Sequence, residues 1–214
     1  MDDHFPEGFY HPEIGTIFHP APSPFGIPYR CLYSRNVDNL FFAGRAISCT
    51  HTAMSACRVM ATCALLGQVV GTAAALAKRG GWTPRDVGVR AVRELQQMLM
   101  EDDCWLPGRV RTVPELTRTA ALEATEGDPE PLRNGRDRPE GGADNGWSGA
   151  PGGAVTYRFD APCRLRGVRL VFDSDLNRGG PHGSGSAGMG CRYPLAAVPN
   201  SLPARLVRAF RIEV

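Results

Sequence analysis

Residues 39–77 constrain the fold more strongly than any other stretch of this 214-residue chain. The segment opens with the apolar run Leu40-Phe41-Phe42-Ala43, bounded by turn-forming residues and by Gly44, which predicts a buried strand. After a loop rich in Ser, Thr and His, a proline-free run of small residues predicts a helix from about residue 53 to 78 that stops at Gly80-Gly81. A strand, a glycine turn and a helix in this order are typical of α/β sites that bind an anion.

The same segment resembles the C-terminal FAD-binding segment of the FAD-dependent oxidoreductase family. The resemblance is carried by NLFFAGRAIS at 39–48 and by THTAMSACRVMATCALLGQVVGTAAALA at 50–77, and it is dense from Gly26 to Ala77. It implies the closing strand and helix of a two-lobed FAD-binding α/β domain, with FAD as cofactor and a small organic molecule as substrate. It also implies a partner, an N-terminal dinucleotide-binding domain with the motif Gly-x-Gly-x-x-Gly. Without that domain, we expect this chain to bind FAD weakly or not at all.

The strand end is the first expected cofactor contact. The resemblance places the backbone of Ala43 and Gly44 against FAD, and a glycine here permits close approach to a pyrophosphate or ribityl group. A simple tight turn is the alternative. Arg45 offers a planar donor fork to a phosphate. Many relatives carry an acidic residue where this chain has Arg45, so the hydrogen bond that such a carboxylate accepts from the ribityl chain is not carried over.

Further candidate contacts lie between the strand and the helix. Ser48 and Thr52 offer hydroxyl groups, although Thr52 is equally a candidate helix N-cap. His51, whose ordinary pKa lies near neutrality, is the candidate catalytic residue, as a hydrogen-bond donor or proton carrier at the flavin, against the alternative of a satisfied loop histidine. Arg58 is expected in the first turns of the helix, where a cation needs a compensating anion: an FAD phosphate or a carboxylate of the fold.

The next segment predicts a second helix with a structural role. Thr83, Pro84 and Asp86 supply an N-cap, a proline at the first helical position and an acid in the first turn. Apolar residues then recur at helical spacing to Glu101. The residues at helical spacing are Val89, Val92, Leu95, Gln96 and Leu99.

From residue 108 the pattern changes to short alternating runs. One or two edge strands are expected within 110–125, a charged linker or disordered stretch over 127–146, and strands at 154–159, 167–172 and 206–214. The segments NGRDRPEGGADNGW and VTYRF with VRLVFDSDLNR resemble a galactose-binding-like, discoidin-type module. That resemblance implies an all-β jelly roll, possibly incomplete. The expected fold class is therefore α+β, with an FAD-domain portion over 1–107 and a β-sandwich module over 108–214.

Composition narrows the functional classes. A formal net charge of +2 is too small to indicate nucleic acid or an anionic membrane surface as a partner. We expect no transmembrane helix, because Gly67 and Gln68 interrupt the apolar run, and no signal peptide at the N-terminus. Seven cysteines without regular spacing favour reduced thiols and a cytoplasmic location.

The sequence gives little support for a metal site. Cys49, His51, Cys57 and Cys63 lie close in sequence but lack zinc-ligand spacing, so no metal is expected there. The acidic run at 173–177 lacks the glycine of an EF-hand, which leaves a looser calcium site as the alternative to no metal. Gly183 to Gly190 is interpreted as a flexible linker. Two alternatives to an oxidoreductase stay open: a carbohydrate- or surface-binding β-module with a remnant FAD segment, and a truncated gene product without function.

Overall fold

The computed structural model describes residues 2–3, 17–18, 24–139, 142, 144–173 and 206–214. The chain divides into two compact units, Met1–Pro162 and Cys163–Val214. The boundary expected between residues 107 and 108 stays a prediction. The linker predicted at 183–190, and the acidic run after Asp173, lie outside the described residues.

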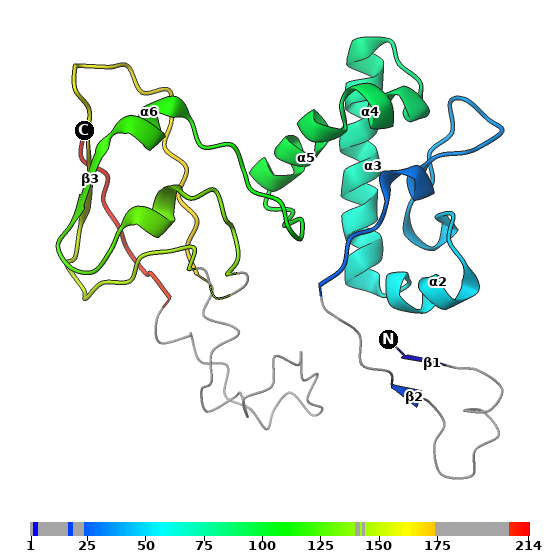
Figure 1. The fold of residues 1–214 in the computed structure, drawn as a ribbon, viewed down its shortest axis with the longest axis horizontal. Helices are drawn as coiled ribbons and strands as arrows, with labels where there is room; N and C mark the ends of the chain where they lie inside the picture. The colour runs from blue at the N-terminus through cyan, green and yellow to red at the C-terminus, as the bar shows by residue number, and fades with distance from the viewer. Residues whose placement is uncertain (1, 4–16, 19–23, 140–141, 143, 174–205) are drawn as a thin grey trace. The chain divides into compact units, whose positions relative to one another are not determined.

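A helical layer forms the core of the first unit (Figure 1). The long helix α3 (Met60–Gly80) packs against α4 (Pro84–Arg90) and α5 (Val92–Glu101). Apolar side chains from all three helices are almost completely removed from water, which is the main stabilising contribution to this layer. The buried residues of this core are Ala73, Leu76, Ala77, Val87, Ala91, Leu95, Leu99 and Cys104.

The predicted long helix is in fact two helices. α2 (His51–Cys57) ends at Arg58, and extended backbone at Val59, with ψ of 149°, separates it from α3. Because no glycine or proline marks this break, the composition did not reveal it. The predicted stop is confirmed: Gly81 adopts φ of 64°, and the amide of Trp82 donates to Ala77 O at 2.8 Å. This is the left-handed glycine cap that commonly ends helices.

The second predicted helix is also divided, at Ala91, into α4 and α5. Its predicted start is confirmed, because Thr83 and Asp86 form a reciprocal capping box with Pro84 in the first turn. The packing role is confirmed for Leu95 and Leu99, which are buried. Val89 was wrongly placed on the packed face, since it is 80% exposed. The break at Ala91 rotates the helical faces, so one period does not run through both helices.

The strand predicted over residues 40–43 is wrong. The structure has a single antiparallel bridge between Tyr33 and Phe41, with the amide of Phe42 donating to Leu32 O at 2.8 Å. Leu40 is 41% exposed, so this segment is not a buried strand. A buried strand needs hydrogen-bonded neighbours, and the described residues supply one short pairing only.

The rest of the first unit contains short elements. β1 (Asp2–Asp3) pairs with β2 (Ile17–Phe18), and β3 (Ala121–Ala124) pairs antiparallel with β4 (Val155–Arg158), with Ala121 opposite Arg158. β4 confirms the strand expected at 154–159. Within 110–125, a strand forms only at β3, and it is preceded by an unexpected helix, α6 (Glu115–Thr119). The described residues also contain three 3-10 turns: η1 (Tyr29–Leu32), η2 (Gly44–Ala46) and η3 (Glu130–Arg133).

The stretch predicted as linker or disorder over 127–146 has defined contacts where it is described. Within it, Asn134 donates to Asp144 O at 2.8 Å, and the flanking residues are joined because Trp147 Nε1 donates to Glu126 O at 2.6 Å. The guanidinium of Arg111 pairs with the largely buried Asp137 at 3.3 Å. Charged and turn-forming residues are typical of disorder in isolation, but here they pair across turns.

The second unit does not support the jelly-roll expectation. The described residues 163–173 and 206–214 contain no strand, so the strands predicted at 167–172 and 206–214 are wrong. The two segments meet at the rings of Phe172 and Phe210, whose centroids lie 5.0 Å apart. Alternating apolar residues alone do not make a strand, because a ladder partner is also required.

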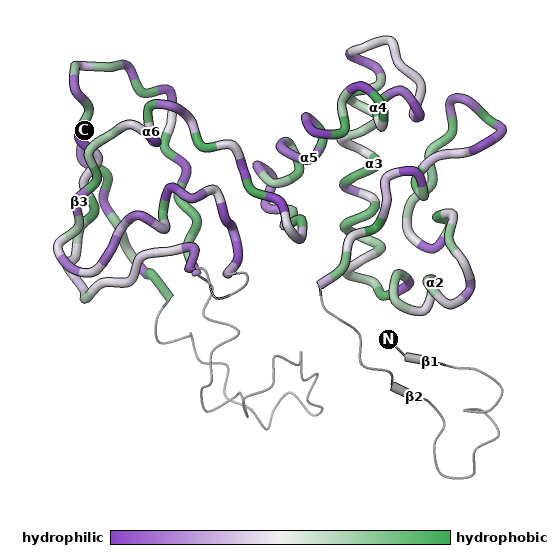
Figure 2. The backbone as a smooth tube through the Cα atoms, in the orientation of Figure 1, coloured by the Kyte–Doolittle hydropathy of each residue, from purple (hydrophilic) through white to green (hydrophobic). Residues whose placement is uncertain are grey.

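α3 bears on the expected absence of a membrane span. With 21 residues it is long and apolar enough to cross a membrane by length and composition alone, and Figure 2 shows it as largely green or pale. The prediction that Gly67 and Gln68 interrupt the apolar run is therefore wrong by these criteria. The core helices of soluble proteins meet the same criteria, and one face of α3 packs against α4 and α5.

Candidate functional site

The candidate site is built on a backbone frame that joins residues 31–34 to residues 40–48. The amide of Ser34 donates to Leu40 O, and that of Ser48 donates to Cys31 O, each at 2.9 Å. These bonds hold the loop that leads into η2. The side chains of Leu32 and Ile47 are buried and pack with those of Cys57 and Leu66, which stabilises the frame.

Gly44 begins the η2 turn in a conformation that favours glycine. Its φ is +59°, a region that residues with a Cβ atom rarely adopt. A Cβ atom built here would lie 3.9 Å from Cys63 Cβ, an ordinary contact. The glycine is therefore required by backbone conformation and not by crowding, and the turn lies against the beginning of α3.

The predicted cofactor residues fall into two neighbouring groups. Ala43, Gly44, Arg45 and Ser48 belong to the η2 turn and its flanks, and the side chains of Arg45 and Ser48 are exposed. α2 contacts η2 and carries the second group, His51 and Thr52, with Arg58 at its C-terminal end. The structure thus brings the predicted residues onto adjoining elements, while their roles toward a cofactor stay predictions.

Two details of the second group differ from expectation. The N-cap of α2 is Thr50, whose hydroxyl oxygen accepts from the amide of Ala53 at 3.2 Å, so Thr52 is not the cap. Thr52 lies in the first turn, with an exposed side chain. Arg58 is the C-cap of α2 and not part of the first turns of a long helix. Neither His51 nor Arg58 is without an interaction partner.

Four cysteines are gathered around this frame. Burial raises the pKa of the Cys57 thiol, and the nearby thiols of Cys49, Cys31 and Cys63 raise it further. Burial followed by the thiol of Cys31 likewise raises the pKa of Cys49. The thiols of Cys49 and Cys57 therefore keep their protons at neutral pH, which makes these two side chains poor nucleophiles. In the part of the chain that the structure describes, no group of three or more His, Cys, Asp or Glu side chains is arranged to hold a metal ion.

A hollow of about 440 Å³ lies beside the frame and was only partly foreseen. Ser48 was predicted from the sequence, but the pocket also includes side chains that no local motif marks. Arg85 comes from α4 and reaches the backbone oxygen of Arg35, 50 residues away, at 3.4 Å. We call this hollow the basic pocket; its lining residues are Arg30, Tyr33, Ser34, Arg35, Phe42, Ser48 and Arg85.

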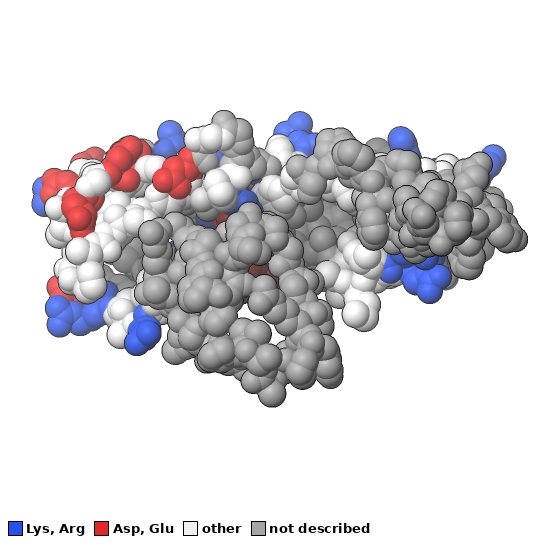
Figure 3. All heavy atoms as spheres, turned by 90° about the horizontal axis from the view of Figure 1, so that it is seen from below, with Lys and Arg blue, Asp and Glu red and all other residues white. Residues whose placement is uncertain are grey.

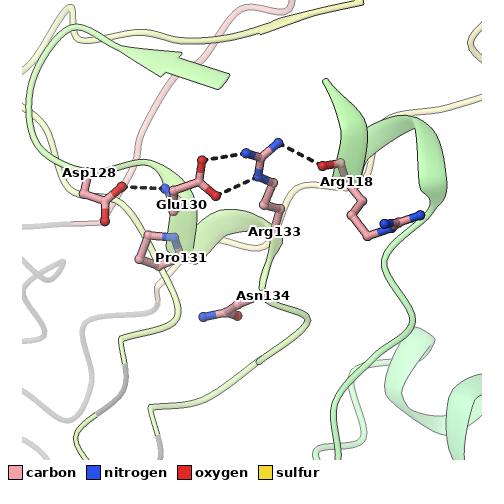
Figure 4. Close-up of a pocket in the computed structure, with 6 residues that line it drawn as sticks. All are labelled: Arg118, Asp128, Glu130, Pro131, Arg133 and Asn134. Atoms are coloured by element: carbon pink, nitrogen blue, oxygen red, sulfur yellow. Dashed lines mark hydrogen bonds and ion pairs between the residues drawn. The ribbon is translucent and has the colours of Figure 1, made fainter. Parts of the chain in front are cut away.

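The residues that line a second hollow, near η3, hold a turn of the chain together (Figure 4). Arg133 forms a two-pronged pair with Glu130, at 2.8 and 2.6 Å, and donates to the backbone oxygens of Arg118 and Ala120. Asp128 accepts from the amide of Glu130 at 2.9 Å. These charges satisfy one another, so they tie the turn together and leave little binding capacity for a ligand.

Comparison with known proteins finds a family match for the segment that contains this site. Residues 1–99 match the family described as FAD dependent oxidoreductase. No curated protein and no solved structure matches the chain. The family match includes η2, α2, α3 and α4, and it gives no support to a galactose-binding-like module after residue 108. The segment that contains the candidate site is thus a match to the FAD dependent oxidoreductase family, whose cofactor is FAD.

Proposed function

We propose that residues 1–99 form part of the FAD site of a flavin-dependent oxidoreductase that acts on a small organic substrate. The observation that carries this proposal is the coincidence of the family match with the Gly44 turn and the two helices after it. When bound, FAD supplies the capacity to accept a hydride or an electron pair. The protein contributes binding, orientation and electrostatics.

The donor groups around Gly44 fit an FAD phosphate or ribityl group. The left-handed turn at Gly44 exposes backbone without a side chain, and Arg45 adds an exposed guanidinium. Ser48 and Thr52 add exposed hydroxyl groups on adjoining elements. Arg58 contributes positive charge at the junction of α2 and α3, and His51 is the candidate to hold or move a proton at its ring nitrogens.

A second part of the proposal concerns the partner of α3. Ala64, Gly67, Gly71 and Ala75 are exposed along one side of this helix, and nothing lies within 4 Å of a Cβ atom placed at either glycine. Such a smooth helix face permits close approach of another backbone. We propose that it packs against a dinucleotide-binding domain with the motif Gly-x-Gly-x-x-Gly, which completes the pyrophosphate site.

Purification of the protein from its own cells tests this function. A C-terminal affinity tag recovers the protein with whatever polypeptide accompanies it, and chromatography of the denatured supernatant identifies any released flavin. We expect FAD to be present, together with a chain or segment carrying Gly-x-Gly-x-x-Gly. A preparation that contains the folded protein and this motif but holds no flavin, even after incubation with FAD, would contradict the proposal.

A further inference from the structure

The basic pocket has the size of a small-molecule site. Its volume of about 440 Å³ falls within the range of roughly 300 to 1,000 Å³ that is usual for ligand pockets. Its walls come from separate parts of the first unit: η1, the loop after it, the bridge segment at Phe42, the η2 flank and α4. A hollow formed by such distant segments depends on the tertiary fold and is not a feature of one loop.

The charge of the pocket is strongly one-sided. Three guanidinium groups line it, those of Arg30, Arg35 and Arg85, and no Asp or Glu is among its lining residues. Within the described ranges, no carboxylate forms a salt bridge with any of the three. Arginine stays protonated at all physiological pH values, so the pocket keeps a positive charge that favours an anion.

The positive charge of the pocket is local, since the chain as a whole is only weakly basic. Figure 3 shows acidic and basic side chains in separate small groups among the described residues of that face, with no continuous basic surface. The formal net charge of the whole chain is only +2. The concentration of three arginines at one hollow therefore favours a small anion over an extended polyanion.

Two of the donors are held in place before any ligand arrives. The guanidinium of Arg85 lies over the ring of Tyr33, 5.3 Å from its centroid, and also bonds to Arg35 O. The hydroxyl oxygen of Ser34 accepts from the amides of Asn36 and Val37, at 3.2 and 3.0 Å. Because a hydroxyl group has two lone pairs, Ser34 is left with its hydrogen to donate.

Aromatic surface completes the pocket. Tyr33 and Phe42 are half-buried lining residues, and the guanidinium of Arg85 lies over the ring of Tyr33. Tyr33 is itself supported by Tyr29, with ring centroids 5.6 Å apart. Arginine forks match the oxygens of phosphate and carboxylate groups, while aromatic faces favour flat ring systems.

We propose that the basic pocket binds a small molecule that carries a phosphate or carboxylate group beside a flat ring. This inference goes beyond the proposed FAD contacts, since it rests on Arg30, Arg35 and Arg85 and holds whether or not FAD binds near Gly44. The anion has two possible sources, a phosphate of the cofactor or a separate anionic substrate, because Ser48 belongs both to the pocket and to the η2 flank.

Isothermal titration calorimetry of the full chain with phenyl phosphate tests the pocket. Phenol and inorganic phosphate serve as probes for the ring alone and the anion alone, and both are expected to bind more weakly. Arg85→Gln and Arg35→Gln are each expected to weaken phenyl phosphate binding by about tenfold, the loss of one charge-assisted hydrogen bond. Arg93→Gln on α5 removes the same charge from an exposed position outside the pocket and is expected to leave binding unchanged.

A separate arm identifies the source of the anion. This arm uses the protein purified from its own cells together with any accompanying polypeptide, in which FAD is expected to bind. If saturating FAD displaces phenyl phosphate, the pocket receives a cofactor phosphate, and if both bind together, the pocket belongs to a second molecule. Either result supports an oxyanion pocket. Absence of phenyl phosphate binding, or an equal loss in the Arg93→Gln and Arg85→Gln proteins, would overturn it. Because this titration needs no flavin, its failure is distinguishable from failure of the proposed oxidoreductase function.

Discussion

The hydroxyl group of Tyr29 donates a hydrogen bond of 2.8 Å to the backbone oxygen of Pro84, 55 residues later in the chain. This bond ties η1 to the first turn of α4. Burial, followed by the neighbouring Tyr33, raises the pKa of Tyr29, so the hydroxyl keeps its proton and stays a donor at neutral pH. The same contact holds the walls of the basic pocket together, because Tyr33 follows η1 and Arg85 follows Pro84.

Tyr29→Phe is expected to lower the free energy of unfolding by about 1 kcal/mol, since the ring is retained and one intramolecular hydrogen bond is lost. Urea denaturation followed by circular dichroism measures the change. Tyr157→Phe is the matched control, because the Tyr157 hydroxyl forms no hydrogen bond among the described residues. An equal loss in both variants would show that the bond to Pro84 contributes nothing specific.

Gly88→Ala tests the packing of the same ring against α4. A Cβ atom at residue 88 would lie 2.8 Å from Tyr29 Cδ1, closer than such contacts occur. The crowding is expected to outweigh the better helix propensity of alanine and to destabilise the protein by about 1 kcal/mol or more. Gly71→Ala in α3 meets only open space and is expected to stabilise by up to about 1 kcal/mol. Thermal unfolding that ranks the two variants in the opposite order would refute this packing.

Gly135→Ala separates crowding from backbone strain in the region before β4. Gly135 has φ of +75°, and a Cβ atom there would lie 2.3 Å from Arg111 O. Gly152 has φ of +91° but nothing within 4 Å of a Cβ position. Alanine at either position is expected to cost about 1 kcal/mol of strain, and at Gly135 roughly 1–3 kcal/mol more. Equal chemical denaturation midpoints for the two variants would contradict the contact with Arg111.

The capping box of α4 predicts a specific acid sensitivity. Hydrogen bonds from the side chain and backbone of Thr83 lower the pKa of Asp86, with a smaller contribution from Arg90. A carboxylate with a lowered pKa stabilises the fold above its unfolded pKa, about 3.9, and this contribution disappears as pH falls through the folded value. The loss therefore occurs in the acid range and not near neutrality.

Thr83→Ala is expected to cost about 1 kcal/mol at pH 7, the usual value of an N-cap. It is also expected to flatten the dependence of stability on pH below about 4, because the main cause of the lowered pKa is removed. Urea denaturation between pH 3 and pH 7 measures both effects. An unchanged pH profile in the variant would mean that Thr83 does not set the pKa of Asp86.

Local signals made parts of the fold predictable from sequence. Thr83, Pro84 and Asp86 marked the start of α4, and Gly81 marked the end of α3, because caps depend on a few adjacent residues. The breaks at Val59 and Ala91 were not predictable, since no proline or glycine stands at either position. Their backbone conformations are set by tertiary packing, which propensity does not describe.

The sequence predicted those parts of the site that depend on adjacent residues, and missed those formed by distant segments. The run around Gly44 identified the turn, and the family match extends over it. The basic pocket was missed because Arg35 and Arg85 are 50 residues apart and meet only after α4 folds back. The strands expected at 167–172 and 206–214 failed for a related reason, since alternation within a segment does not supply a pairing partner.

The central claim, that the Gly44 turn contacts FAD, is tested most directly by comparing Gly44→Ala with Gly81→Ala. Both glycines have left-handed φ values, +59° and +64°, but Gly81 caps α3 outside the candidate site. FAD affinity is measured by flavin fluorescence, on protein purified from its own cells with any accompanying polypeptide. We predict that Gly44→Ala weakens FAD binding by about tenfold or more, whereas Gly81→Ala lowers stability but leaves affinity unchanged. Equal FAD affinity in the two variants would contradict the account.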